Sequence, residues 1–373
     1  MKRHPLHVVI YTDAAGMGGA EISVGHLIAT ISPDIQITVV GVVANVVNAI
    51  ADRRPHTTRL VLPTPRIHSW VTHLATFRQL QPDIIHCNLC TPWACAIALF
   101  TALLLPHTRV VRVDQLPLRT TDLITWLRTR LLSLRVDAHV AVGQASARRM
   151  EDFYALGRDT VISIPNGVPD YCSQLSPSQN PAKSDRMIVG SIGRLDAMKA
   201  HDILLRAIAQ VDGVQVVILG EGAERPNLER LAVELGVGDR LQLLGWLDVP
   251  QAYLSGFDVV ALPSRSEGFP LAMVEAMLAA RPVIATRVGS MPEAIIDGQT
   301  GLLIEKDDVE GLAHALRRLR DNPHWRSQLG KTARELAIAQ FTVKAMAQRY
   351  EDLWDKVLSA PQRSRWRVPR PKD

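Results

Sequence analysis

The sequence predicts an α/β fold of two doubly wound parallel-sheet domains. Strand-like apolar runs alternate with segments of helical length along nearly all of the 373 residues, a pattern typical of parallel sheets covered by helices. The alternation is interrupted by CSQLSPSQNPAKSD (172–185), a stretch rich in Ser, Pro and Asn, and then restarts. The length is also sufficient for two domains that each bury a core of their own.

The first expected domain covers residues 1–171. Its expected strands are LHVVIYT, QITVVGVVA, RLVLP, DIIHC, RVVRV, AHVAVG and VISIPNG, which begin at residues 6, 36, 59, 83, 109, 138 and 161. The apolar stretch from Thr91 to Pro106 is shorter than the roughly 20 residues that cross a bilayer. We therefore expect a buried helix that begins near Pro92, and no transmembrane helix.

The second expected domain covers residues 186–342. Its expected strands are MIVGSIG, VQVVILG, RLQLLG, DVVALP, PVIAT and GLLIE, which begin at residues 187, 214, 240, 258, 282 and 301. Two helices, about 323–340 and 343–359, close the chain before a basic tail (360–373). Ligands of such sheets bind at the carboxyl ends of the strands, so we expect the site in a cleft between two facing domains.

Positive charge is concentrated in the first half and in the tail. The net charge is +5, and residues 1–170 hold 16 basic and 12 acidic side chains. The segment RTTDLITWLRTRLLSLR (119–135) combines four arginines with Trp126 and leucines at helical spacing. It fits a helix on an anionic membrane surface, or an amphipathic helix packed on a sheet. No nucleic-acid motif accompanies the charge, so nucleic acid is not an expected partner.

The cysteines indicate a reducing compartment. Three of the four lie close together, as Cys87, Cys90 and Cys95, and no disulfide framework is apparent. With His86 they could imitate a zinc site, but a strand end that leads into an apolar helix explains them more simply. There is no D-x-D pair and no P-loop motif, so no metal and no cofactor are expected.

Two glutamates stand out in SRSEGFPLAMVEAM (264–277). Glu267 follows the run DVVALP, and a helix is expected to begin near Pro270, where free N–H groups and Gly268 favour an anionic ligand. Glu275 is the only polar residue between Leu271 and Ala280. A carboxylate there is costly unless it is paired, either with an arginine or with the hydroxyl groups of a ligand.

Two further stretches favour phosphate chemistry. In SIGRLDAMKAHD (191–202), Arg194 and Lys199 lie at a strand–helix turn, where they would suit a diphosphate or stand as solvated charges. In AAGMGGAE (14–21), Gly18 and Gly19 either admit a phosphate or sugar to the backbone or simply form a turn. Glu21 replaces the third glycine of the dinucleotide fingerprint.

Together these stretches resemble the family 4 glycosyltransferases (glycosyl transferases group 1) of the GT-B fold, which has two Rossmann-like domains. SEGFPLAMVEAMLAARPVIATRVGSMPEAIIDGQTGLLI (266–304) carries the E-x7-E element of that family as Glu267 and Glu275. GRLDAMKAHD, IPNGV (164–168) and GGAE match other family elements. FTVKAMAQRYEDLW (341–354) is similar to the helix that crosses back to the N-terminal, acceptor-binding domain.

The resemblance implies transfer of a sugar with retention of configuration, without a metal, from a nucleotide-sugar bound by the C-terminal domain. Arg194 and Lys199 would neutralise the diphosphate, Glu275 would bind the ribose, and Glu267 would face the transferred sugar. The other implied donor-binding residues are Gly18, Gly19, Gly245, Gly268, Phe269, Pro270 and Leu271. Many relatives carry a histidine near the end of the run RVVRV, close to the reacting sugar. This chain has Asp114 or Gln115 there, so we expect either that Asp114 takes that catalytic place or that the acceptor chemistry differs.

The expected donor is a UDP- or GDP-sugar, and the expected acceptor is a glycan, a lipid-linked saccharide or a glycolipid of cell-surface polysaccharide biosynthesis. An epimerase or hydrolase of the same fold, or a non-catalytic protein that binds nucleotide-sugars, is the alternative. The expected location is cytoplasmic and peripheral on the inner face of the cell membrane, through residues 119–135 and the tail.

Overall fold

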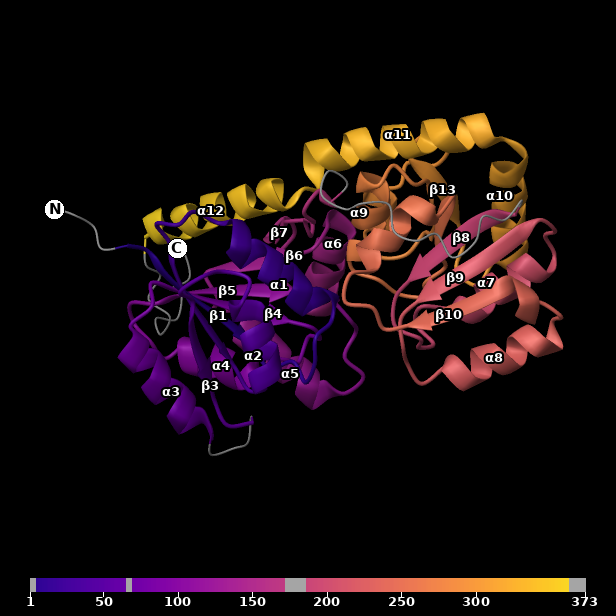
Figure 1. Cartoon of the computed structure of the whole chain (residues 1–373). Coiled ribbons are helices and arrows are strands. Elements are labelled where there is room, and N and C mark those ends of the chain that lie inside the picture. Colours follow the sequence, from indigo (N-terminus) through magenta and orange to yellow (C-terminus); the bar gives the residue numbers. More distant parts are fainter. Residues whose placement is uncertain (1–4, 65–68, 172–185, 362–373) are drawn as a thin grey trace. The chain divides into compact units, whose positions relative to one another are not determined.

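The computed structural model describes residues 5–64, 69–171 and 186–361 (Figure 1). The chain divides into two compact units: unit 1 is residues 1–165 with 343–373, and unit 2 is residues 166–342. Unit 2 therefore begins before the expected boundary at 171, because Asn166 Nδ2 donates a hydrogen bond to Phe269 O at 3.1 Å. The polar stretch 172–185 and residues 362–373 of the basic tail lie outside the described residues.

Unit 1 contains a seven-stranded parallel sheet, as the apolar runs predict. Its strand order is β3-β2-β1-β4-β5-β6-β7. In that order the strands are Thr58–Val61, Gln36–Gly41, His7–Thr12, Ile84–Leu89, Arg109–Asp114, Ala138–Ala141 and Val161–Ser163. The order reverses between β1 and β4, which places the end of β1 at a topological switch point.

Helices cover both faces of this sheet. Val8 and Ile10 of β1 share a core with α1 (Gly19–Thr30), α2 (Ala44–Ala51) and α12 (Val343–Ser359). Val9 and Tyr11, which alternate with them, share the other core with α3 (Ser69–Leu80) and α4 (Ala96–Ala102). Right-handed crossovers place α5 (Leu123–Ser133) and α6 (Gln144–Phe153) on the α4 face, and α5 contacts α4.

The helix expected to begin near Pro92 begins later, at Ala96. Cys95 precedes it with a left-handed backbone (φ 56°), a conformation that cannot continue a right-handed helix. The backbone N–H of Cys95 donates to Asp13 Oδ2 at 2.7 Å, which holds this turn against the end of β1. The late start thus depends on a residue far away in the sequence.

The last helix, α12, belongs to unit 1 although it follows unit 2 in the chain. Trp354 is fully buried in the unit 1 core, and its ring lies 6.0 Å from the His86 ring of β4. Glu351 Oε1 also accepts a hydrogen bond from Ser32 N at 2.6 Å. The bounds of α11 (Pro323–Gln340) and α12 coincide with the helices expected from the sequence.

Unit 2 contains a six-stranded parallel sheet of order β10-β9-β8-β11-β12-β13. In that order the strands are Leu241–Gly245, Val214–Leu219, Met187–Ile192, Val259–Leu262, Val283–Thr286 and Gly301–Ile304. The other α-helices are α7 (His201–Ala209), α8 (Arg225–Glu234), α9 (Leu271–Leu278) and α10 (Val309–Asp321). Short 3-10 helices are η2 (Gly238–Arg240), η3 (Pro250–Gly256) and η4 (Met291–Glu293). Across the described ranges, no helix is both long and apolar enough to cross a membrane.

Candidate functional site

A short ion pair at the strand ends of unit 2 joins Lys199 to Glu267. Lys199 Nζ lies 2.6 Å from Glu267 Oε1, and Ser264 Oγ donates to the same oxygen at 2.8 Å. Glu267 is 9% exposed. Ser264 is in turn fixed by Thr286 Oγ1, which donates to Ser264 O at 2.6 Å. The carboxylate that follows β11 is therefore held in one orientation by charge-assisted hydrogen bonds.

A glycine turn holds the backbone of Glu267 and Gly268 in place. Gly289 has a left-handed backbone (φ 56°), and a Cβ there would lie 2.0 Å from Glu267 O. The next residue, Ser290, donates its N–H to Gly268 O at 2.9 Å. Only glycine permits this close approach.

The Lys199 side chain lies over Gly193, at the end of β8. A Cβ on Gly193 would approach the Lys199 side chain to 3.4 Å. Arg194, which was predicted to act with Lys199, is different: its side chain is 70% exposed, and its Nη2 lies 2.9 Å from Asp196 Oδ2. The structure thus brings Lys199 and Glu267 together. Arg194, although close to Lys199 in the sequence, lies on the surface and pairs with Asp196.

The helix after Glu267 begins one residue later than expected. Pro270 is the N-cap of α9, with an extended backbone (ψ 133°), and Leu271 is the first helical residue. Phe269 is buried, and its ring packs against the Phe341 ring at a centroid distance of 5.1 Å. The Phe269 side chain is therefore a core element, so any contact that it makes with a ligand must come from its backbone.

Glu275 is buried in α9, and among the described residues it has no arginine partner. Its Oε1 accepts a hydrogen bond from Gln251 Nε2 at 2.8 Å, and burial raises the pKa of the carboxyl group above 4.5. Glu275 and Gln251 line a cavity of about 240 Å³, together with Tyr171 and Arg281. Gln251 was not predicted as a site residue, because it lies in η3 and no motif marks it.

A larger cavity of about 330 Å³ lies between α7 and α8, away from the two glutamates. Its charged side chains include Arg265 and Asp202, which pair with each other at 2.8 Å. Gly245, one of the implied donor-binding residues, ends β10 with φ 78°, and its carbonyl accepts a hydrogen bond from Gly220 N at 2.8 Å.

In unit 1, the predicted glycines form the start of α1. Gly18 is the N-cap and Gly19 the first helical residue. The Glu21 carboxylate reaches back to accept a hydrogen bond from Gly18 N at 3.2 Å and one from Cys90 Sγ at 2.9 Å. Burial raises the pKa of Glu21, although these hydrogen bonds act against the increase. Glu21 therefore fixes the glycine turn.

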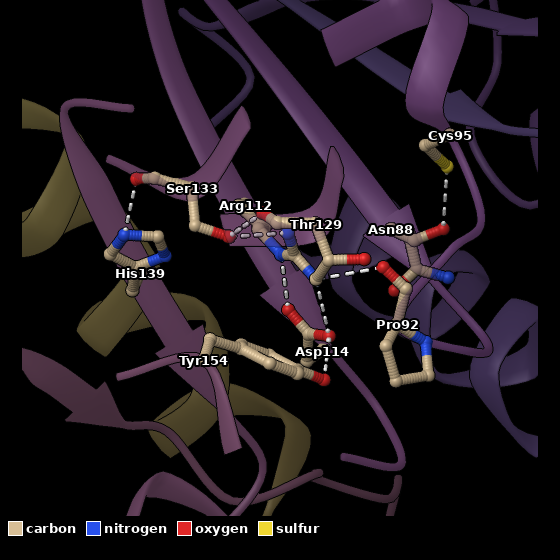
Figure 2. Close-up of polar contacts among 9 residues, drawn as sticks. All are labelled: Asn88, Pro92, Cys95, Arg112, Asp114, Thr129, Ser133, His139 and Tyr154. Atoms are coloured by element: carbon tan, nitrogen blue, oxygen red, sulfur yellow. Dashed lines mark hydrogen bonds and ion pairs between the residues drawn. The ribbon is translucent and has the colours of Figure 1, made fainter. Parts of the chain in front are cut away.

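Asp114 lies in the core of unit 1, in contrast to its predicted place beside the reacting sugar (Figure 2). Its two oxygens accept hydrogen bonds from Arg112 Nε at 2.7 Å and Arg112 Nη2 at 3.0 Å. Arg112 is fully buried and Asp114 is 1% exposed. Burial disfavours the guanidinium charge, but Asp114 outweighs this and the pKa of Arg112 is raised. Asp114 is thus a buried ion-pair partner of Arg112, and the catalytic role expected for it stays a prediction.

Gln115, the other residue considered for that place, is only partly buried. Its Nε2 donates to Asn88 Oδ1 at 2.9 Å. Within the described ranges, no group of three or more His, Cys, Asp or Glu side chains is arranged to hold a metal ion.

The fold and the sequence motifs together define a class of two-domain enzymes, and two protein-family models match this chain. Residues 17–170 match the model described as Glycosyltransferase Family 4, and residues 173–336 match Glycosyl transferases group 1. The chain belongs to the family 4 glycosyltransferases of the GT-B fold.

Similar proteins include enzymes of lipopolysaccharide synthesis. The chain is 32% identical over 170 residues to the lipopolysaccharide core biosynthesis glycosyltransferase LpsE of Rhizobium meliloti, covering 46% of this chain and 50% of the relative. It is 36% identical over 193 residues to D-inositol 3-phosphate glycosyltransferase of Saccharomonospora viridis, covering 48% and 44%. The matched segment spans about half the length of each of these relatives.

A solved structure matches over nearly the whole fold. HepE of Anabaena, crystallised in complex with UDP, superposes with a TM-score of 0.84 at 19% identity, covering 94% of this chain and 100% of that chain. At this identity the similarity concerns the fold.

Proposed function

We propose that this protein is a retaining glycosyltransferase that moves a sugar from a UDP- or GDP-sugar to a glycan, a lipid-linked saccharide or a glycolipid of the cell surface. The observation that carries the proposal is the Lys199–Glu267 pair at the strand ends of unit 2. Support comes from LpsE, named for lipopolysaccharide core synthesis, and from HepE, solved with UDP and with UDP-glucose.

Departure of the nucleoside diphosphate builds negative charge in the transition state. Lys199 would neutralise this charge together with Arg194, whose side chain is 70% exposed. Glu267, already oriented by Ser264, would hold the hydroxyl groups of the transferred sugar. These roles need no metal ion.

The buried pair of Glu275 and Gln251 would take the ribose. A carboxylate without a cationic partner accepts hydroxyl protons well, and its cavity offers an amide beside it. In unit 1, Gly18 and Gly19 stay predicted donor-binding residues, and the N–H of Gly18 already donates to Glu21 Oε2. Asp114 is left out of the proposed catalytic set because of its pairing with Arg112.

We further propose that the acceptor is met at a membrane surface on the cytoplasmic side. The basic, leucine-rich segment 119–135 supports this part of the proposal.

The proposal is tested with Lys199→Ala and Glu275→Ala, using Lys306→Ala, at an exposed lysine of unit 2, as a matched control. Thermal shifts with UDP-, GDP-, ADP- and TDP-sugars identify the sugar donor. Turnover with an acceptor extract should fall about 100-fold or more in Lys199→Ala. Wild-type turnover in both site variants contradicts the site. Sugar release without acceptor indicates a hydrolase, and binding without turnover indicates a binding protein.

A further inference from the structure

Helix α5 packs on unit 1 through its polar side chains. Thr129 is 2% exposed and Ser133 is 1% exposed. A surface helix ordinarily turns its apolar stripe to the core and its polar face to water. In α5 this arrangement is reversed.

The buried polar face is held by a hydrogen-bond network (Figure 2). Arg112 Nη1 donates to Ser133 Oγ at 2.7 Å, and Ser133 Oγ donates to Thr129 O at 2.6 Å. His139 Nε2 lies 2.8 Å from Ser133 O. Because Asp114 fixes Arg112 in turn, this polar network anchors α5 to strand β5, and among the leucines of the helix Leu132 packs against the core beside it.

Trp126 and Arg130 also serve this anchorage. Trp126 Nε1 donates to Phe153 O at 2.8 Å, and Arg130 Nη1 donates to Tyr154 O at 2.8 Å. The Arg130 guanidinium lies 5.7 Å from the centroid of the Trp126 ring. The tryptophan and one arginine of segment 119–135 thus bind α6.

The outward face of α5 is apolar. The exposed fractions are 69% for Leu123, 80% for Ile124, 44% for Leu127, 63% for Leu131 and 55% for Leu134. Positions 123, 127, 131 and 134 follow one another at spacings of three and four residues, so they share a helix face. Clustered apolar side chains of this kind mark a contact surface.

The surrounding charges define what that surface contacts. Arg119, Arg128 and Arg135 are exposed around the leucines. The acidic residue of the segment, Asp122, is occupied as the helix cap, since its Oδ1 accepts a hydrogen bond from Thr125 N at 2.8 Å. On the neighbouring α4, Phe100 is also exposed. Leucines that enter the acyl boundary while arginines meet headgroup phosphates match an anionic bilayer.

We propose that α5 is a docking helix that inserts Leu123, Ile124, Leu127, Leu131 and Leu134 into the interface of an anionic membrane. Its inward polar network keeps the helix folded and oriented before it meets the lipid. The inference rests on the proposed function in one respect, because this surface is where a lipid-linked acceptor would be met.

The test is sedimentation of the whole chain with vesicles of phosphatidylcholine, with and without phosphatidylglycerol. Wild-type protein should bind the anionic vesicles, less strongly as salt rises. Leu127→Ser combined with Leu131→Ser should lower vesicle binding by about tenfold or more, since each removes an apolar side chain from the lipid. The matched control is Val233→Ser, which changes a side chain that is 76% exposed on α8 of unit 2.

Unchanged binding of the double variant, or absence of wild-type binding to anionic vesicles, overturns the inference. Dimerisation that requires the same leucines, without vesicle binding, also overturns it and makes α5 an interface between copies of the chain. Nucleotide-sugar binding is measured on the same samples. If it fails in every form while vesicle binding follows the leucines, the proposed function is wrong and the docking helix stands.

Discussion

Replacing Asp114 with alanine distinguishes a structural role for this residue from a catalytic one. The change leaves the fully buried Arg112 guanidinium without its anionic partner, and among the described residues Ser133 Oγ and Pro92 O remain as its acceptors. Removing one partner of a buried ion pair costs about 3–5 kcal/mol. For a unit of this size, each kcal/mol lowers the melting temperature by about 2–4 °C. The expected fall is therefore about 6–20 °C.

The assay is scanning calorimetry together with sugar transfer at a temperature where the variant is still folded. Asp114 belongs to unit 1, so a transition of unit 2 and its response to nucleotide-sugars should remain. Asp152→Ala is the matched control, because it breaks an ion pair with Arg158 on the surface and should change stability little. Wild-type stability of Asp114→Ala combined with lost sugar transfer would refute the structural role and restore the catalytic one.

Three further predictions concern unit 2 and the acid response. Gly289→Ala should lower turnover about tenfold or more, because the added Cβ displaces the backbone of Glu267. The control is Gly236→Ala, at a glycine that also has a left-handed backbone but has open space around it, and it should cost only about 1 kcal/mol of stability. Equal turnover in the two variants would contradict this prediction. Glu275→Gln should stabilise the protein at pH 8, because burial raises the pKa of Glu275 and makes its deprotonated form unfavourable in the folded state. Urea denaturation should show that this gain in the free energy of unfolding vanishes near pH 4.5. A gain that does not depend on pH would exclude the ionisation of Glu275 as its cause. Burial lowers the pKa of His86 from 6.5 to about 3, so below pH 6.5 the unfolded chain binds a proton that the folded chain excludes. Each pH unit of acidification in this range therefore costs the wild type stability, and His86→Phe should reduce that loss by about 1.4 kcal/mol per pH unit. An unchanged dependence of the unfolding free energy on pH would show that His86 does not contribute.

The strands were predictable because each is a short apolar run between turn residues, and the parallel pairing follows from their alternation with helices. The start of α4 could not be predicted from the local sequence, because it depends on a contact between Cys95 and Asp13, which are 82 residues apart. The Arg112–Asp114 pair did leave a signal: opposite charges two positions apart in a strand lie on the same side of the sheet.

Within the candidate site, sequence motifs predicted Glu267, Lys199 and Glu275, but no motif marks Gln251, which lies in the 3-10 helix η3. It also showed that α5 is amphipathic without showing which face turns inward. That choice depends on Arg112 of β5, which offers the helix a polar surface to pack on.

The late arrival of α12 has a consequence for the order of folding on the ribosome. Most of unit 1 is synthesised first, yet Tyr350 and Trp354 of its core emerge only after the whole of unit 2. Unit 2 is complete once Thr342 has emerged, so it can close while the sheet of unit 1 still exposes the apolar surface that α12 will cover. A nascent chain of this protein therefore passes through a stage in which its second half is folded and its first half is open.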